Sequence, residues 1–164
     1  RIMLLSARGA RAFDLITWLA RAQRQPLVRR RFAGAADDAP DVESDYLDLP
    51  AHGRQGLRLI ANARKGLAMG MTHAFLPDYT AVVVLLDQDP AANQRIVDRV
   101  LAACRQVHHL PTIVGLGTQA ELTTDLMEQV ERQGLAWLAA RTRTGKPDLG
   151  DYWVALLPAL NALE

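Results

Sequence analysis

Short apolar runs alternate with amphipathic segments along most of this chain. A continuous apolar run bounded by turn residues is typical of a strand buried in a parallel sheet. The sequence predicts such strands over residues 1–6, 80–86, 112–116 and 135–140. Residues 44–49 alternate between polar and apolar side chains, as a half-buried strand does, and residues 27–32 are compatible with a strand.

Amphipathic segments separate these runs. Apolar residues that recur at helical spacing predict helices over residues 12–22, 93–107, 123–133 and 148–163. Pro158 lies inside the last of these, where a proline removes one backbone hydrogen bond and kinks the helix. Residues 51–70 mix apolar and basic side chains with glycines, so we expect a partly helical segment that gives way to a flexible turn over 66–71.

The alternation of strands and helices sets the fold class. Strand–helix–strand units connect by right-handed crossovers and build a mostly parallel sheet. We therefore expect an α/β protein with a mostly parallel six-stranded sheet and helices on both faces. The length fits a single domain over residues 1–164.

Opposite charges border a loop in the first third of the chain. The basic run Arg29-Arg30-Arg31 precedes the loop over residues 33–40, and an acidic run over 37–43 follows the arginines. The simpler interpretation is a solvated edge hairpin, because charged side chains usually lie on the surface. The functional interpretation is a charged edge that binds a partner.

Composition excludes several classes of partner. The net charge is +1, which does not indicate nucleic-acid or membrane-surface binding, and no apolar run has transmembrane length. Cys104 is the only cysteine, so the chain has no internal disulfide and fits a reducing, cytoplasmic compartment. Because the chain begins with Arg1 and not with Met, we expect that a short N-terminal piece or a neighbouring domain precedes it.

Few residues suggest metal or nucleophile chemistry. The four histidines are too scattered to form a metal site. Cys104 lies on the apolar face of a predicted helix, where a thiol packs in the core rather than reacting.

Six segments occur in an order that can be compared with a known family. They read RIMLLS, SARGARAF, DLPAHG, AVVVLLDQD, PTIVGLGTQAEL and RTRTGKP. In this order and spacing the chain resembles the Ras-like small GTPases, and its nearest pattern is the ethanolamine- and propanediol-utilisation GTPase family. The resemblance implies a three-layer P-loop NTPase fold.

The phosphate-binding loop of that family is altered here. A working loop reads G-x-x-x-x-G-K-[ST]. Ser6 and Arg11 stand at its two glycine positions, and Ala12 and Phe13 stand at its lysine and hydroxyl positions. We expect Phe13 above all to fill the space of the nucleotide. Two loop residues remain between the glycine positions that could matter to such a site: Arg8, a possible source of charge, and Gly9.

The other boxes are altered as well. The magnesium-side turn D-x-x-G begins with Asp48 and ends with Ala51, and His52 stands where the family orients the attacking water. The guanine-reading box [NT]-K-x-D becomes Thr118, Gln119, Ala120 and Glu121. Glu121 keeps the carboxylate, one methylene longer.

The resemblance implies a pseudo-GTPase that binds no cofactor and acts as a protein-interaction or regulatory module. Its expected partner is a true GTPase, a GTPase regulator or a second copy of this chain. The exposed candidates for contact are Arg8, Arg11, Arg29, Arg30, Arg31, His52, Arg54 and Arg58. The alternative is a divergent GTP- or GDP-binding protein with Mg²⁺, either a slow GTPase that uses Asp48, His52 and Glu121 or a switch that does not hydrolyse.

Overall fold

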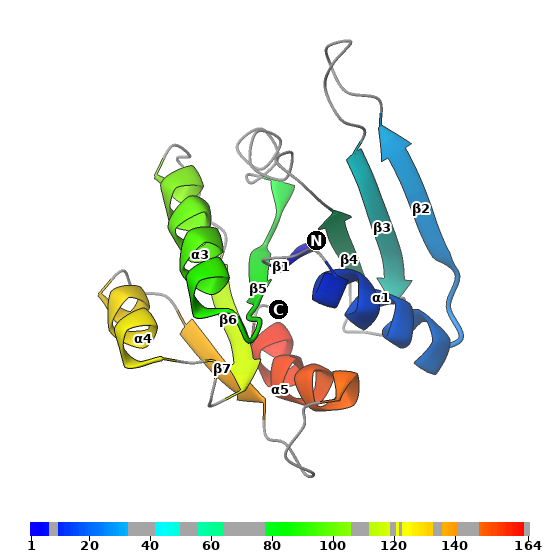
Figure 1. The fold of residues 1–164 in the computed structure, drawn as a ribbon. Helices are drawn as coiled ribbons and strands as arrows, with labels where there is room; N and C mark the ends of the chain where they lie inside the picture. Colours follow the sequence, from blue (N-terminus) through cyan, green and yellow to red (C-terminus); the bar gives the residue numbers. More distant parts are fainter. Residues whose placement is uncertain are drawn as a thin grey trace.

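The computed structural model describes most, but not all, of the chain. The described residues are 1–6, 10–32, 42–49, 56–63, 78–105, 112–118, 121, 123–132, 136–140 and 148–162. The strands are β1 (Ile2–Ser6), β2 (Leu27–Phe32), β3 (Val42–Leu49), β4 (Leu57–Ala63), β5 (Ala81–Leu85), β6 (Thr112–Thr118) and β7 (Ala136–Ala140). The helices are α1 (Ala10–Ala22), α3 (Pro90–Cys104), α4 (Thr124–Glu131) and α5 (Leu149–Asn161) (Figure 1).

The strands form one mixed sheet in the order β2-β3-β4-β1-β5-β6-β7. The central strand β1 pairs in parallel with β4 and β5, and β5, β6 and β7 continue in parallel. The strands β2, β3 and β4 pair with one another in antiparallel fashion. The predicted α/β class with a mostly parallel sheet is confirmed.

One strand was not expected. Residues 57–63, assigned by the sequence to a partly helical segment, form β4, which lies between β3 and β1 and makes the sheet seven strands wide. Leu59, Ile60 and Ala61 in its centre are all buried, as in any strand paired on both sides. The flanking glycines hid this strand in the sequence pattern.

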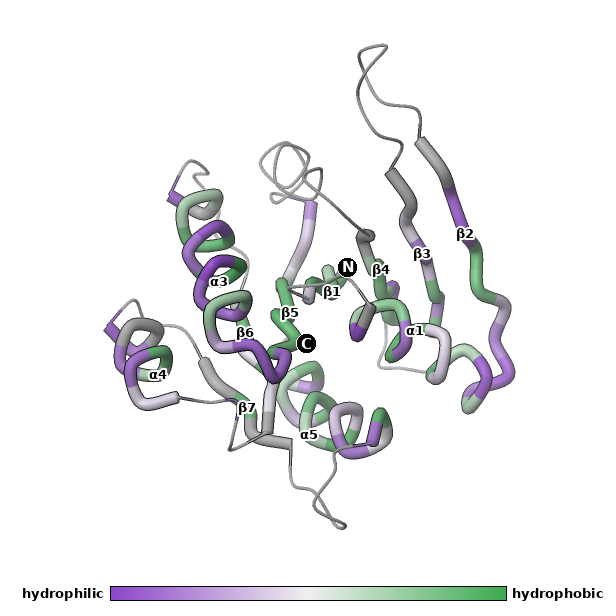
Figure 2. The backbone as a smooth tube through the Cα atoms, viewed as in Figure 1, coloured by the Kyte–Doolittle hydropathy of each residue, from purple (hydrophilic) through white to green (hydrophobic). Residues whose placement is uncertain are grey.

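Helices cover both faces of the sheet. Successive side chains of the central strands point to opposite faces, and because these strands are apolar almost throughout, both faces need covering. Ile2 and Leu4 join a core cluster with residues of α1 and α5. Met3 and Leu5 join a second cluster with residues of α3 and α4. Figure 2 shows the hydrophobic colouring concentrated in β1 and β5 and on the sheet-facing sides of the helices.

Local sequence signals explain where two helices begin. Asp89 caps α3 by accepting from the backbone N–H of Ala92 at 3.1 Å, and Pro90 occupies the first turn. Asp148 and Asp151 form a reciprocal capping box at the start of α5. The helix α5 runs through Pro158 and continues to Asn161.

Some expectations fall outside the described part. These are the loop over residues 33–40, the turn over 66–71 and the side-chain environment of Cys104. Among the described residues, no helix combines the length and the apolar character that crossing a membrane requires.

Candidate functional site: a polar network at the carboxyl edge of the sheet

Three parallel strands end side by side at one edge of the sheet. The register pairs Ser6 of β1 with Leu85 of β5, and Leu85 with Leu116 of β6. The segments that follow these strands therefore meet at this edge, which is where open α/β sheets hold their ligands. They supply the start of α1, the turn after β5, and Glu121 after β6.

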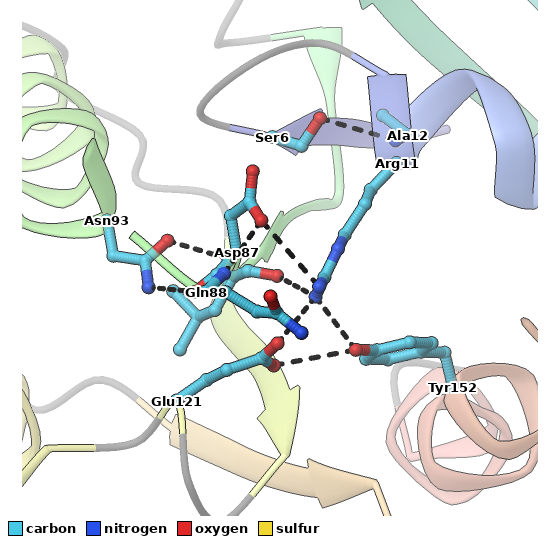
Figure 3. A network of polar contacts seen from close by, with 9 residues as sticks. Ser6, Arg11, Ala12, Asp87, Gln88, Asn93, Glu121 and Tyr152 are labelled. Atoms are coloured by element: carbon cyan, nitrogen blue, oxygen red, sulfur yellow. Dashed lines mark hydrogen bonds and ion pairs between the residues drawn. The ribbon is translucent and has the colours of Figure 1, made fainter. Parts of the chain in front are cut away.

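Arg11, in the first turn of α1, is the centre of a polar network at this edge (Figure 3). Its Nη1 donates to Glu121 Oε1 at 2.9 Å, to the hydroxyl of Tyr152 at 2.8 Å and to the backbone carbonyl of Leu86. Its Nη2 lies 3.7 Å from Asp87 Oδ1. One guanidinium thus joins α1, the turn after β5, α5 and the segment after β6.

The ion pair of Arg11 and Glu121 is largely withdrawn from water. The side chain of Glu121 is 5% exposed and that of Arg11 is 22% exposed. A carboxylate withdrawn from water in this way is costly unless a cation and hydrogen bonds compensate it. Arg11 supplies both at a short distance.

Tyr152, from α5, completes the network. Its ring lies against the guanidinium of Arg11, with 5.7 Å from the guanidinium carbon to the ring centre, and its hydroxyl donates to Glu121 Oε2 at 3.4 Å. Burial raises the pKa of Tyr152 to about 12, with Glu121 adding to the rise and the charge of Arg11 opposing it. The hydroxyl therefore stays protonated and remains a donor at neutral pH.

A buried asparagine fixes the turn that carries Asp87. The backbone N–H of Asp87 donates to Asn93 Oδ1 at 2.7 Å, and Asn93 Nδ2 donates to the carbonyl of Asp87 at 2.6 Å. Asn93 is fully buried. Its role was not predicted from the sequence, although the Asp-x-Asp-Pro turn before α3 was the available signal.

Gly117, near the end of β6, permits close packing beside the network. A Cβ atom there would lie 2.9 Å from Leu86 Cδ1 and 3.3 Å from Glu121 Oε2. Any larger residue would push on the turn and the carboxylate together. The glycine is therefore part of how Glu121 is positioned.

The predicted loop residues are placed as follows. The backbone N–H of Ala12 donates to Ser6 Oγ at 3.3 Å, so the serine hydroxyl ties β1 to the first turn of α1. Phe13 is partly buried and packs against the apolar cluster on the α1 and α5 face of the sheet. Arg11, rather than Phe13, is the side chain that crosses the carboxyl edge.

Asp48 lies at the end of the sheet where β1 begins, opposite the carboxyl edge. It is near the end of β3, which runs antiparallel to β4, and its register partner Arg58 is at the start of β4. Arg58 donates to both carboxylate oxygens at 2.6 and 2.8 Å, and this hydrogen bonding is the main cause that lowers the pKa of Asp48. The structure thus separates Asp48 from Glu121, two residues that the sequence analysis assigned to one site.

The remaining predicted residues give less information. Thr118 is the last residue of β6, where its backbone pairs with Ala140. The positions outside the described residues are Arg8, Gly9, Ala51, His52, Arg54, Gln119 and Ala120. Within the described part, no group of three or more histidines, cysteines or acidic residues could hold a metal ion.

Comparisons with known proteins do not name a family. The chain matches no model of a protein family, and no curated protein matches it. What the structure defines is an α/β protein with a mixed, mostly parallel sheet and an internally bonded polar network at its carboxyl edge.

Proposed function

We propose that this protein is a non-catalytic, Ras-like pseudo-GTPase whose nucleotide site is closed by its own side chains and whose role is to bind other proteins in the cytoplasm. The observation that carries the proposal is the ion pair between Arg11 Nη1 and Glu121 Oε1 at 2.9 Å. In the comparison with the Ras-like GTPases, Arg11 stands at the second glycine of the phosphate loop and Glu121 stands at the carboxylate that reads guanine. Here the two altered positions are bonded to each other.

A guanine base would have to compete with this pair. The base would offer neutral N–H donors to the carboxylate of Glu121, whereas Arg11 offers a full positive charge. Replacing Arg11 by a neutral base would leave two charges in this partly buried site without their partners, which is costly. The hydroxyl of Tyr152 also donates to the same carboxylate. Displacing Arg11 would in addition remove its bond to the carbonyl of Leu86.

A triphosphate would find no replacement for its lost partners. Ala12 cannot supply the cation that neutralises the β- and γ-phosphates, and Phe13 cannot supply the hydroxyl for Mg²⁺. Each lost charge-assisted contact is worth about 1.5–3 kcal/mol, so several together weaken nanomolar binding to the millimolar range. The alternative of a slow GTPase that combines Asp48 with Glu121 conflicts with their positions at opposite edges of the sheet.

Thermal unfolding with and without nucleotide tests the proposal. A ligand present at 100 times its Kd stabilises a protein by about 2.7 kcal/mol, which raises Tm by roughly 5–10 °C for a chain of this length. We expect no shift with GTP, GDP or ATP and Mg²⁺ at about 1 mM, a level that would reveal binding with a Kd of about 10 μM. We also expect no nucleotide in the native mass spectrum of the untreated protein.

Positive results would overturn the pseudo-GTPase assignment. A saturable rise of Tm with GTP, or GDP retained through purification, would show a working nucleotide site. Phosphate release that survives extensive purification and disappears in the Glu121→Gln variant would show an enzyme. Proteins that co-purify with the chain test the interaction role separately, and the expected classes are a GTPase, a GTPase regulator or a second copy.

A further inference from the structure

The strand β2 forms the outer edge of the sheet among the described strands. Its backbone pairs with β3 from Leu27, opposite Leu47, to Phe32, opposite Val42. An outermost strand presents a row of N–H and C=O groups on its other side, which is a template for a further strand. The opposite edge of the sheet is formed by β7.

The exposed side chains of β2 include an apolar residue and a cation. Val28 is 48% exposed, and it is one of only two large hydrophobic residues exposed in the described part of the chain. Beside it, the guanidinium carbon of Arg30 lies 5.5 Å from the ring centre of Tyr46. Arg30 has no carboxylate partner among the described residues, so it presents an exposed cation next to an apolar spot.

The strand already paired with β2 shows what kind of strand it accepts. In the register of β2 and β3, Arg29 lies opposite Asp45 and Arg31 lies opposite Glu43. Arg29 donates through Nε and Nη2 to the two carboxylate oxygens of Asp45, both at 2.8 Å. Basic residues of β2 therefore alternate against acidic residues of a neighbouring strand.

We propose that the open side of β2 binds an extended acidic segment of a partner protein as an additional strand. Main-chain hydrogen bonds would give the affinity, and alternate side chains would give the specificity. Acidic residues would face the arginines, and an apolar residue would lie beside Val28. A second copy of β2 is a poor occupant, because antiparallel pairing of β2 with itself would place arginines of both copies beside one another, which is destabilising.

This proposal gives a place and a chemistry to the interaction proposed above. It rests on that function only in supposing that a partner exists. Strand addition at β2 does not require the carboxyl edge to be closed, since β3, β4 and β1 lie between β2 and β5. Peptide binding and nucleotide binding are measured separately, so each proposal can fail without the other.

A peptide with the sequence of β3, Val-Glu-Ser-Asp-Tyr-Leu-Asp-Leu, is a suitable probe. It is blocked at both ends, labelled with fluorescein and titrated with the whole protein by fluorescence anisotropy. We expect saturable binding with a Kd of about 10–100 μM, weaker at high salt because the exposed charges are screened. A control peptide with Asn and Gln in place of Asp and Glu should bind at least about tenfold more weakly, the loss of several exposed charge pairs.

Two matched protein variants locate the site. We expect Arg30→Glu to weaken the binding of the acidic peptide about tenfold, because it removes an exposed cation of β2 and places a negative charge beside the acidic residues of the added strand. Arg99→Glu makes the same charge change at an exposed position on α3 and should leave the Kd within about twofold. Equal losses in both variants would show attraction to overall charge and would overturn the proposal.

N-methylation of the peptide tests the backbone hydrogen bonds. Methyl groups on alternate backbone nitrogens block one edge of an added strand and leave the other edge able to pair. We expect one methylated series to lose binding and the series shifted by one residue to keep it, with backbone amide NMR shifts confined to β2. Equal binding of both series, or no binding of the unmodified peptide at about 1 mM, a concentration far above the expected Kd, would overturn strand addition.

Discussion

The pair of Arg11 and Glu121 allows a quantitative test of the closed site. We consider three variants, namely Arg11→Met, Glu121→Gln and the double substitution. Methionine keeps much of the length of the arginine side chain and removes its charge. Glutamine keeps the shape of Glu121 and removes its charge.

The magnitudes follow from burial and from the bonds that each change removes. Arg11→Met leaves the carboxylate of Glu121, 5% exposed, without its cation, and breaking a buried pair in this way costs about 3–5 kcal/mol of unfolding free energy. Glu121→Gln costs less, about 1.5–3 kcal/mol, because Arg11 keeps the carbonyl of Leu86, the hydroxyl of Tyr152 and nearby Asp87.

The double variant should cost less than the sum of the single variants. Once the carboxylate is gone, losing Arg11 no longer leaves a buried charge unpaired, so we expect a coupling of about 1–3 kcal/mol between the two positions. The assay is urea unfolding at pH 7, followed by circular dichroism and tryptophan fluorescence, with midpoints compared at equal m-values. Arg11→Lys, which keeps the charge but not the fork of donors, is the variant to use if Arg11→Met fails to fold.

A coupling below about 0.5 kcal/mol would refute this reasoning, because additive costs are expected only for residues that do not interact. It would mean that the geometry of the network does not translate into stability. It would also remove the main support for a nucleotide site held closed by Arg11.

Three further predictions concern other parts of the chain. Asp45→Asn should lower the unfolding free energy by about 2 kcal/mol, because the side chain of Asp45 is fully buried. Asp48→Asn breaks a similar arginine contact on the same strand, but it should cost less than about 1 kcal/mol because the side chain of Asp48 is 60% exposed. Gly117→Ala should destabilise by about 1–3 kcal/mol, seen as a lower Tm, because its Cβ would clash with the turn after β5; an unchanged Tm would contradict this. The pKa of Tyr152 is raised from 10.0 to about 12, so the stability it contributes is complete below pH 10 and is lost as the pH rises to 12. The unfolding free energy from urea titrations should fall over this pH range by about 2 kcal/mol more in the parent than in Tyr152→Phe, and equal slopes against pH would contradict the assignment.

The sequence predicted those elements whose signal is local. The strands β1 and β5 are buried at every position but Ser6, which explains why each appears in the sequence as a continuous apolar run. The strand β4 was missed because glycines surround it and an arginine interrupts its start. Of its two neighbours, β3 is the preceding strand in the chain, whereas β1 is remote in the sequence and leaves no local pattern in β4.

The sequence singled out Arg11 and Glu121 of this network, but not their contacts, and it did not single out Tyr152, Asp87 or Asn93 as site residues. Arg11 and Glu121 stood out separately as altered motif positions, yet they are 110 residues apart and no spacing rule connects them. Asp48 and Glu121 were grouped by their motif positions alone, with no prediction of how the strand that carries Asp48 pairs. That strand, β3, is antiparallel to its neighbour, which sends its end to the other edge of the sheet.

Three strands, β3, β4 and β1, separate the open side of β2 from β5 and the proposed closed site at the carboxyl edge. In a nucleotide switch, the ligand at the carboxyl edge alters the surface that binds partners, because it contacts the two states differently. In the proposed closed site, the place of such a ligand is taken by bonds within the chain, from Arg11 to Glu121 and Tyr152. A ligand that does not bind cannot shift an equilibrium, so the open side of β2 would be available in every state of this protein. The affinity of β2 for an acidic segment should therefore be the same with and without GTP and Mg²⁺, and its regulation would depend on the partner.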